Sequence, residues 1–280
     1  MRKIKIILIF IIFLGLFYSK AKLSASNKQV FRYTFSPFTP AYYKIFFNGY
    51  ISYSPENAKP HKYIINGMYI LKITNIYTSD KAYNLKISPV KGRFMLDGHT
   101  LEDITVSETE VSQIVPEMYI EMNKRGKIIK SRQGTGLFDF MSFLEILPCF
   151  PQNVVVGQRW YQTIPYFNLH FAKMPKLKFT YVYMGKQNGL DKFHILSNQF
   201  FHQQEKENNI KTKIKGINFS NGRILFDSQT DLIKQAKVHF KFSVYFIANI
   251  SPIKTKEENN PIPYHIMVDI SFLLSPVQIP

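Results

Sequence analysis

The feature that most limits the fold of this chain is a strict alternation of apolar and polar residues. In Lys237–Ile250, every second residue from Val238 to Ala248 is apolar, and most residues between them are polar or charged. Successive side chains of a β-strand point to opposite faces, so a period of two is typical of a strand with one buried face. The alternation recurs in several other stretches, which are Tyr43–Tyr53, Lys176–Met184 and His265–Leu274. The sequence therefore predicts a mainly β protein of roughly ten or eleven antiparallel strands.

Turn signals separate these stretches. Asn66-Gly67 predicts a tight turn into a strand that starts at Met68, and Ser79-Asp80-Lys81 predicts the next turn. Asn123–Gly126 lies between two short strand-like runs and predicts a hairpin, and Gln187-Asn188-Gly189 predicts another. Similar hairpins before and after the middle of the chain are consistent with two related halves, or with chance similarity between hairpins.

One stretch, Leu137–Leu147, has helical rather than strand periodicity. Its polar residues Asp139, Ser142 and Glu145 recur every third position, and apolar residues fill the remaining arc until Pro148 ends the helix. A helix this apolar needs an apolar surface to pack against, and the strands are the available candidates. We therefore expect a strongly curved half-barrel or a two-sheet structure with one central apolar helix packed inside. The halves 41–135 and 166–280 would be joined by the helix and Pro-rich segment 136–165, all within a single β-rich domain, 41–280.

The N-terminus predicts export. Met1–Lys5 is basic, Ile6–Tyr18 is an uninterrupted apolar run, and Ser19-Lys20-Ala21 offers small residues for cleavage, so we expect residues 1–21 to be a signal peptide. An apolar run of this length is shorter than the ~20 residues that an anchoring helix needs. The following stretch, Lys22–Pro40, is polar and marked by Pro, and we expect an extended, poorly ordered lead-in. The predicted location is periplasmic or extracellular, either free or attached to the envelope.

The chain is basic, with 36 Lys and Arg against 19 Asp and Glu and a net charge of +17. Loss of the signal peptide would lower this charge to +13, since it removes four cations, Arg2, Lys3, Lys5 and Lys20. The lysines are scattered along polar strand faces, which is typical of a solvated surface. A basic excess also suits an anionic partner such as an envelope surface or an acidic polysaccharide. Export removes the usual reason for binding nucleic acid, so no nucleic-acid partner is expected.

Cys149 is the only cysteine, so the chain has no internal disulfide. It lies among Pro148, Phe150 and Pro151 with no neighbouring histidine or acid. A thiol becomes a nucleophile when a base or a cation lowers its pKa. We therefore expect a buried, inert thiol.

The stretch Phe150–Trp160 resembles a segment, F-P-x-x-x-V-x-V-G-x-x-W, of a family of uncharacterised exported bacterial β-proteins. The matching residues are Phe150-Pro151, Val154, Val156-Gly157 and Trp160. The overall plan is also similar to the periplasmic lipoprotein-carrier fold, in which an antiparallel half-barrel covers a helix over an apolar cavity. That resemblance implies binding of acyl chains, although similarity of fold alone does not establish function.

No catalytic or metal-binding pattern is present. The seven histidines show no zinc-ligand spacing, and there is no nucleophile elbow or dinucleotide-binding loop. Gly134-Thr135-Gly136 lacks the lysine of a phosphate-binding loop. One stretch without Lys or Arg contains seven acids, which are Asp97, Glu102, Asp103, Glu108, Glu110, Glu117 and Glu121. They could form a solvated acidic edge of the protein, or supply paired carboxylates for glycoside hydrolysis. We expect no enzyme activity, no cofactor and no metal.

The sequence favours an exported, non-enzymatic β-protein that binds or carries a lipid or another apolar ligand. Phe138, Met141 and Leu144 on the predicted helix are the candidate ligand-binding residues, because they would face the apolar strands. A fully packed core without a cavity fits the same pattern. The alternatives are a structural or interaction module that binds an anionic envelope polymer or a protein, and an envelope hydrolase. The oligomeric state stays open.

Overall fold

The computed structural model describes residues 28–55, 59–96, 99–100, 115–133, 144–164, 176–207, 210–248 and 262–279. The predicted signal peptide, the Gly134-Thr135-Gly136 segment and most of the predicted helix lie outside these residues. The described strands are β1 (Ala41–Pro55), β2 (His61–Thr78), β3 (Ala82–Leu96), β4 (His99–Thr100), β5 (Met118–Asn123), β6 (Ile128–Gln133), β7 (Arg159–Ile164), β8 (Leu177–Gln187), β9 (Leu190–Glu207), β10 (Ile210–Asp227), β11 (Leu232–Ala248) and β12 (Ile262–Pro276).

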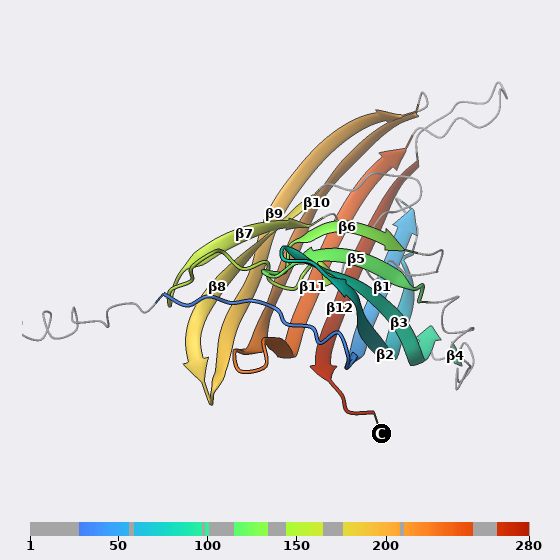
Figure 1. The fold of residues 1–280 in the computed structure, drawn as a ribbon. Coiled ribbons are helices and arrows are strands. Elements are labelled where there is room, and N and C mark those ends of the chain that lie inside the picture. Colours follow the sequence, from blue (N-terminus) through green and yellow to red (C-terminus); the bar gives the residue numbers. More distant parts are fainter. Residues whose placement is uncertain are drawn as a thin grey trace, which may run out of the picture.

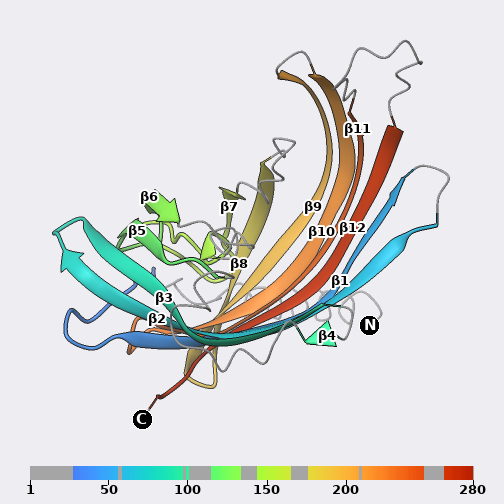
Figure 2. The same ribbon diagram turned by 90° about the vertical axis from the view of Figure 1, so that its right-hand side faces the viewer.

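All twelve strands belong to one antiparallel sheet, as Figure 1 shows. The order across the sheet is β6-β5-β3-β2-β1-β12-β11-β10-β9-β8-β7, with β4 paired to β3 outside this path. Strands β1–β6 therefore form one half and β7–β12 the other, and the halves meet where β1 pairs with β12. The prediction of a mainly antiparallel β fold is confirmed. It takes the form of a single strongly bent sheet that does not close, since β6 and β7 lie at its two edges (Figure 2).

The alternation in the sequence determines which face of each strand is buried. In β11, Val238, Phe240, Phe242 and Val244 are buried, while Lys237, Lys241 and Tyr245 are exposed. In β2, buried residues alternate with partly exposed ones from Ile65 to Asn75. Burial of one apolar face is the main favourable contribution to the stability of such a sheet.

Several predicted turns are confirmed, and one is wrong. Asn123–Gly126 connects β5 to β6, and the turn at Asn188 and Gly189 connects β8 to β9 with positive φ at both residues. By contrast, Asn66-Gly67 lies inside the continuous strand β2. The glycine is needed there because an added Cβ would lie 2.0 Å from Cζ of Phe47 on the neighbouring strand.

The predicted helix Leu137–Leu147 falls largely outside the described residues. Its last part, residues 144–147, forms a single turn in which Leu147 N–H donates to the Leu144 carbonyl over 3.0 Å. Within the described part of the chain, no helix is both long and apolar enough to cross a membrane.

Candidate functional site

The candidate site is the buried, apolar face of the sheet, which we call the inner face. It is the face that contains Tyr69, Phe179, Tyr181, Phe193 and Phe226, and each of these side chains has at most 1% of its surface exposed. Figure 2 shows the long strands β9–β12 and β1–β2 bending together, with β5, β6 and β7 at one end of the bend. The inner face joins residues from both halves of the sheet into one apolar cluster. Continuity of this surface makes it the natural place for an extended apolar ligand.

Aromatic rings lie over glycines at three places on the inner face. Phe47 covers Gly67 of β2, Tyr69 covers Gly92 of β3, and Phe201 covers Gly216 of β10. At Gly92, a Cβ would lie 2.1 Å from the Tyr69 ring. Glycine on a strand leaves room for a neighbouring side chain, so these positions let adjacent strands bend closely while their rings stay packed.

One end of the inner face is closed by two segments that come from outside the sheet. They are the linker residues 144–158 and the N-terminal segment 28–35, which pair through an isolated bridge between Gln29 and Val154. Phe31 and Phe150 lie 5.2 Å apart, centroid to centroid. Phe31 also lies 5.1 Å from Phe193 and 5.8 Å from Phe226. We call this the closed end; its edge-to-face ring packing is the geometry that aromatic quadrupoles favour.

The lead-in before Pro40 was predicted to be poorly ordered, and that prediction is wrong for Phe31 and Tyr33. Both side chains are buried in the closed end. Tyr33 N–H donates to the Lys124 carbonyl over 2.7 Å, and its hydroxyl donates to the Pro148 carbonyl over 3.1 Å. Burial raises the pKa of the Tyr33 hydroxyl well above its ordinary value. This segment therefore ties the linker to the turn between β5 and β6.

Side chains from β7 and β8, together with backbone groups of other segments, satisfy the backbone of the linker. Gln162 on β7 accepts a hydrogen bond from Cys149 N–H over 2.9 Å and donates to the Glu145 and Leu147 carbonyls. Tyr181 on β8 donates to the Ile146 carbonyl over 2.7 Å. Phe150 N–H donates to the Arg125 carbonyl over 2.8 Å, from the opposite edge of the sheet. The linker thus bridges the edges that β6 and β7 leave unpaired with each other.

Tyr183 and Asp191 fix the N-terminal segment to the strands β8 and β9. The Tyr183 hydroxyl lies 2.6 Å from Asp191 Oδ1 and 2.8 Å from Gln29 Oε1. Burial, followed by the hydrogen bond with Asp191, raises the pKa of Tyr183. The tyrosine therefore stays protonated and keeps donating at neutral pH, which suits a structural contact.

A short polar chain crosses the otherwise apolar inner face. Asn218 is fully buried, donates to Ser197 Oγ over 2.7 Å and accepts from Ser220 Oγ over 2.9 Å. Ser197 in turn donates to the Lys178 carbonyl over 2.9 Å. Buried polar groups need partners, and these three side chains supply them to one another. They hold β8, β9 and β10 in register.

The candidate ligand-binding residues from the sequence are only partly described. Phe138 and Met141 lie outside the described residues. Leu144 is buried and belongs to the apolar cluster at the closed end. Phe31 and Tyr33 were not among the predicted residues, although their alternation with Arg32 and Thr34 is a strand-like signal.

Cys149 has the surroundings of an inert thiol. It is partly buried and unpaired by disulfide, and desolvation raises its pKa. The neighbouring cations Arg125 and Lys127 lower the pKa by less than burial raises it. A thiol whose pKa is raised is less ionised at neutral pH and less nucleophilic.

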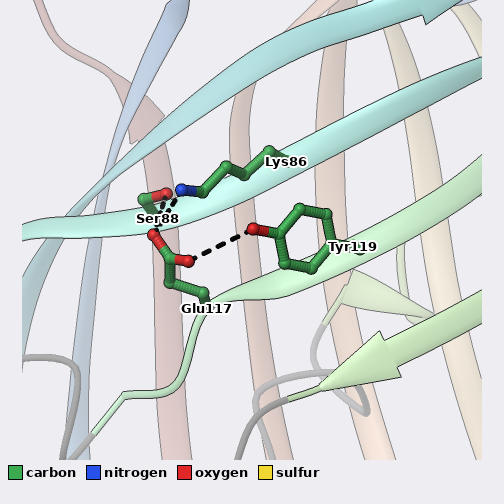
Figure 3. Close-up of polar contacts among 4 residues, drawn as sticks. All are labelled: Lys86, Ser88, Glu117 and Tyr119. Atoms are coloured by element: carbon green, nitrogen blue, oxygen red, sulfur yellow. Dashed lines mark hydrogen bonds and ion pairs between the residues drawn. The ribbon is translucent and has the colours of Figure 1, made fainter.

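The described acids of the acidic stretch form ion pairs. Figure 3 shows Lys86, Ser88 and Tyr119 around the Glu117 carboxylate, with Lys86 Nζ at 2.7 Å and Ser88 Oγ at 3.0 Å. The hydrogen bond from Lys86 lowers the pKa of Glu117. Glu121 lies 4.0 Å from Lys130. Glu117 therefore joins β3 to the start of β5, while Asp97, Glu102, Asp103, Glu108 and Glu110 lie outside the described residues.

Among the residues that are described, no three His, Cys, Asp or Glu side chains form a metal-binding group.

A cationic pocket lies beside the closed end. It has a volume of about 520 Å³ and is lined mainly by Arg32, Lys81, Lys124 and Arg125, with Asp80 as its acid. These cations come from the N-terminal segment, the turn between β2 and β3, and the turn between β5 and β6. Backbone hydrogen bonds from Tyr33 to Lys124 and from Phe150 to Arg125 fix these segments together. The pocket is suited to an anion.

Comparison with known proteins gives no match to any protein-family model or any curated protein. Among solved structures, the chain is similar to one described as "Lipid-protein interactions in lipovitellin", with a TM-score of 0.43 and 12% sequence identity. The similarity covers 86% of this chain and 25% of that chain, so this chain spans about a quarter of the length of the structure it matches.

Proposed function

We propose that this protein holds or carries a lipid or another molecule with an acyl chain against its inner face, without catalysing a reaction. The observation that supports this proposal is the inner face itself, a continuous apolar surface on one bent sheet whose edges β6 and β7 do not pair. Transfer of each methylene from water to such a surface is worth about 0.8 kcal/mol, so a long acyl chain has ample driving force.

The closed end gives the ligand a direction. Phe31 and Phe150 fill the space between the sheet edges there, and hydrogen bonds with Gln162 and Tyr181 hold the linker in place. The acyl chain would therefore lie along β9–β12 and β1, away from this end. Side chains of that region, such as Phe240 and Val244, are already buried by contacts within the protein. Binding must exchange their present contacts for contacts with the ligand.

The test is lipid extraction of the purified protein followed by mass spectrometry, together with uptake of a fluorescent fatty acid. We expect co-purifying lipid and saturable uptake. Phe242 on the inner face of β11 stacks on Phe201 at 5.6 Å, and Phe242→Ala should weaken uptake about tenfold through lost apolar contact. The matched control is Tyr245→Ala on the exposed face of the same strand. Absence of both bound lipid and uptake in the unaltered protein would show that the core is simply packed.

A second role, binding of an anionic envelope polymer, is supported by the cationic pocket. Four cations and one acid line this pocket, so it should attract a polyanion, and added salt should weaken that attraction by screening. Inorganic polyphosphate is a suitable probe. The pair Arg32→Gln and Lys124→Gln should weaken its binding, while Lys44→Gln and Lys91→Gln remove the same charge elsewhere on the sheet. Equal losses in the two pairs would indicate a general effect of net charge and exclude the pocket.

A further inference from the structure

The face of β9, β10 and β11 opposite to the inner face, which we call the outer face, has an unusual charge distribution. From His194 to His202, Lys213 to Arg223 and Lys237 to Tyr245, its positions contain five Lys or Arg residues and, in these described stretches, no Asp or Glu. The five are Lys213, Lys215, Arg223, Lys237 and Lys241. The nearest acid on the adjoining strand is Asp269, whose Oδ1 lies 2.7 Å from His239 Nε2.

Like charges lie directly beside one another at one end of this patch. Arg223 is opposite Lys237 on β11 and opposite His194 on β9. These three residues, with Leu196, Asn221 and His239, line a shallow depression of about 360 Å³. Like charges at directly opposed strand positions destabilise a sheet, so this arrangement works against the fold. A ligand anion in the depression would relieve the repulsion.

Exposed apolar side chains lie next to the cations. Phe200 is 79% exposed, Phe219 48% and Leu196 44%. Phe200 is opposite Ile217, and Phe219 is opposite both Asn198 and Lys241. On neighbouring strands these side chains lie diagonally across from one another, within reach for contact. The result is an exposed apolar cluster with cations at both ends.

We propose that the outer face of β9–β11 docks on an anionic phospholipid bilayer. Arg223 and Lys237, with His194 beside them, would bind lipid phosphate groups, and Leu196, Phe200 and Phe219 would enter the boundary between headgroups and acyl chains. The apolar cluster decides between possible anionic partners, because a hydrated polysaccharide gives Phe and Leu no apolar environment to enter. This surface faces away from the inner face, so the proposal is independent of any ligand bound there.

The test measures binding of the protein, as cells process it from the full chain, to sedimented vesicles. Vesicles of phosphatidylcholine with phosphatidylglycerol are compared with vesicles of phosphatidylcholine alone. We expect binding to the anionic vesicles that weakens as salt rises. The double variant Arg223→Gln, Lys237→Gln should lower the partition coefficient about 30-fold, from about fivefold per basic residue. Phe200→Ser with Phe219→Ser should lower it as well, at constant charge.

The matched control is Lys91→Gln with Arg132→Gln, which removes two exposed cations from β3 and β6 and should leave vesicle binding unchanged. Circular dichroism and the melting temperature show whether each variant is folded. Equal binding to neutral vesicles, or an equal loss in the control pair, would overturn the proposal. So would unchanged binding in the Phe200 and Phe219 variant, because the surface would then bind polyanions through charge alone.

Discussion

Asn218 shows how a single polar side chain can order an apolar face. Its amide lies between Ser197 and Ser220 with no exposed surface, and the three side chains satisfy each other. An apolar residue at this position would pack without strain in many sheets, but here it would leave two buried hydroxyl groups without this partner. The polar chain thus favours one alignment of β8, β9 and β10 over shifted ones.

Replacement of Asn218 with Ala should lower the free energy of unfolding by about 2–3 kcal/mol, because it leaves buried hydroxyls with fewer partners and a small cavity. Asn221→Ala is the control, since Asn221 is exposed on the same strand, and its effect should stay within about 0.5 kcal/mol. Urea denaturation measures both. Similar small effects for the two variants would mean that the polar chain contributes nothing specific.

The ion pair of Glu117 and Lys86 has a definite pH dependence. The hydrogen bond between them lowers the pKa of Glu117 and raises that of Lys86. Its contribution to stability is therefore full above the unfolded pKa of Glu, about 4.3, and is lost as pH falls through the lowered pKa. On the alkaline side it is lost as pH rises through the raised pKa of Lys86.

Glu117→Gln should therefore destabilise the protein at pH 7 and have a much smaller effect at pH 3. Both side chains are about one-third exposed, so the difference should be at most about 1 kcal/mol and should shrink in high salt. Urea midpoints at the two pH values test this. A difference that persists unchanged at pH 3 would indicate a role for Glu117 other than the ion pair.

The linker between β6 and β7 replaces a strand pairing that the sheet lacks. Gln162 alone contacts three backbone groups of the linker. Because these groups are at least half-buried, removal of the amide would leave them without partners. One glutamine of a short edge strand therefore contributes several of the hydrogen bonds that hold the closed end.

Gln162→Leu should lower the free energy of unfolding by about 3 kcal/mol, because it leaves an N–H and two carbonyls of the linker unsatisfied. Thr163→Val is the control on the neighbouring, exposed position of β7. Unfolding can be followed by fluorescence of Trp160, the only tryptophan, which is stacked on Tyr181 at 5.6 Å. A loss below about 1 kcal/mol would show that other contacts hold the linker.

The strands and their buried faces could be predicted from the sequence, but the order in which the strands pair in the sheet could not. The alternation of Lys237–Ile250 correctly indicated β11 and its apolar side, because period two follows from strand geometry. The alternation does not specify which strand pairs with which. The prediction of a turn at Asn66-Gly67 was wrong because these residues have a second reason to be present. The ring of Phe47, distant in the sequence, occupies the space above Gly67, so a glycine is needed inside the strand. Phe31 was missed because the surrounding Pro and polar residues concealed a short alternating run.

The twelve described strands form one open antiparallel sheet, with β6 at one edge and β7 at the other. Among the described strands, β4 apart, each pairs with the next along the chain and β1 pairs with β12, while β6 and β7 do not pair with each other. In the part of the chain that the structure describes, the linker and the N-terminal segment fill the gap between β6 and β7 at the closed end. The described structure is therefore firmly held at one end, and ligand exchange would occur away from that end.

A bound acyl ligand should stabilise the folded state. At a free fatty-acid concentration of 100 times its dissociation constant, the free energy of unfolding should rise by about 2.7 kcal/mol, because the unfolded chain has no such face. Differential scanning calorimetry in the presence of a medium-chain fatty acid measures this as an increase in melting temperature. Tyr245→Ala should keep the increase and Phe242→Ala should reduce it. An unchanged melting temperature would argue against occupancy of the inner face.

The pairing of β1 with β12 also determines how the protein must be made. Tyr43 is aligned with Pro276, so one edge of β1 has no partner strand until β12 has been synthesised and has reached it. β2 can cover the other edge at once, whereas a bare edge readily recruits strands from other nascent chains. Recovery of soluble protein should consequently depend on chaperones that shield β1 until β12 pairs with it.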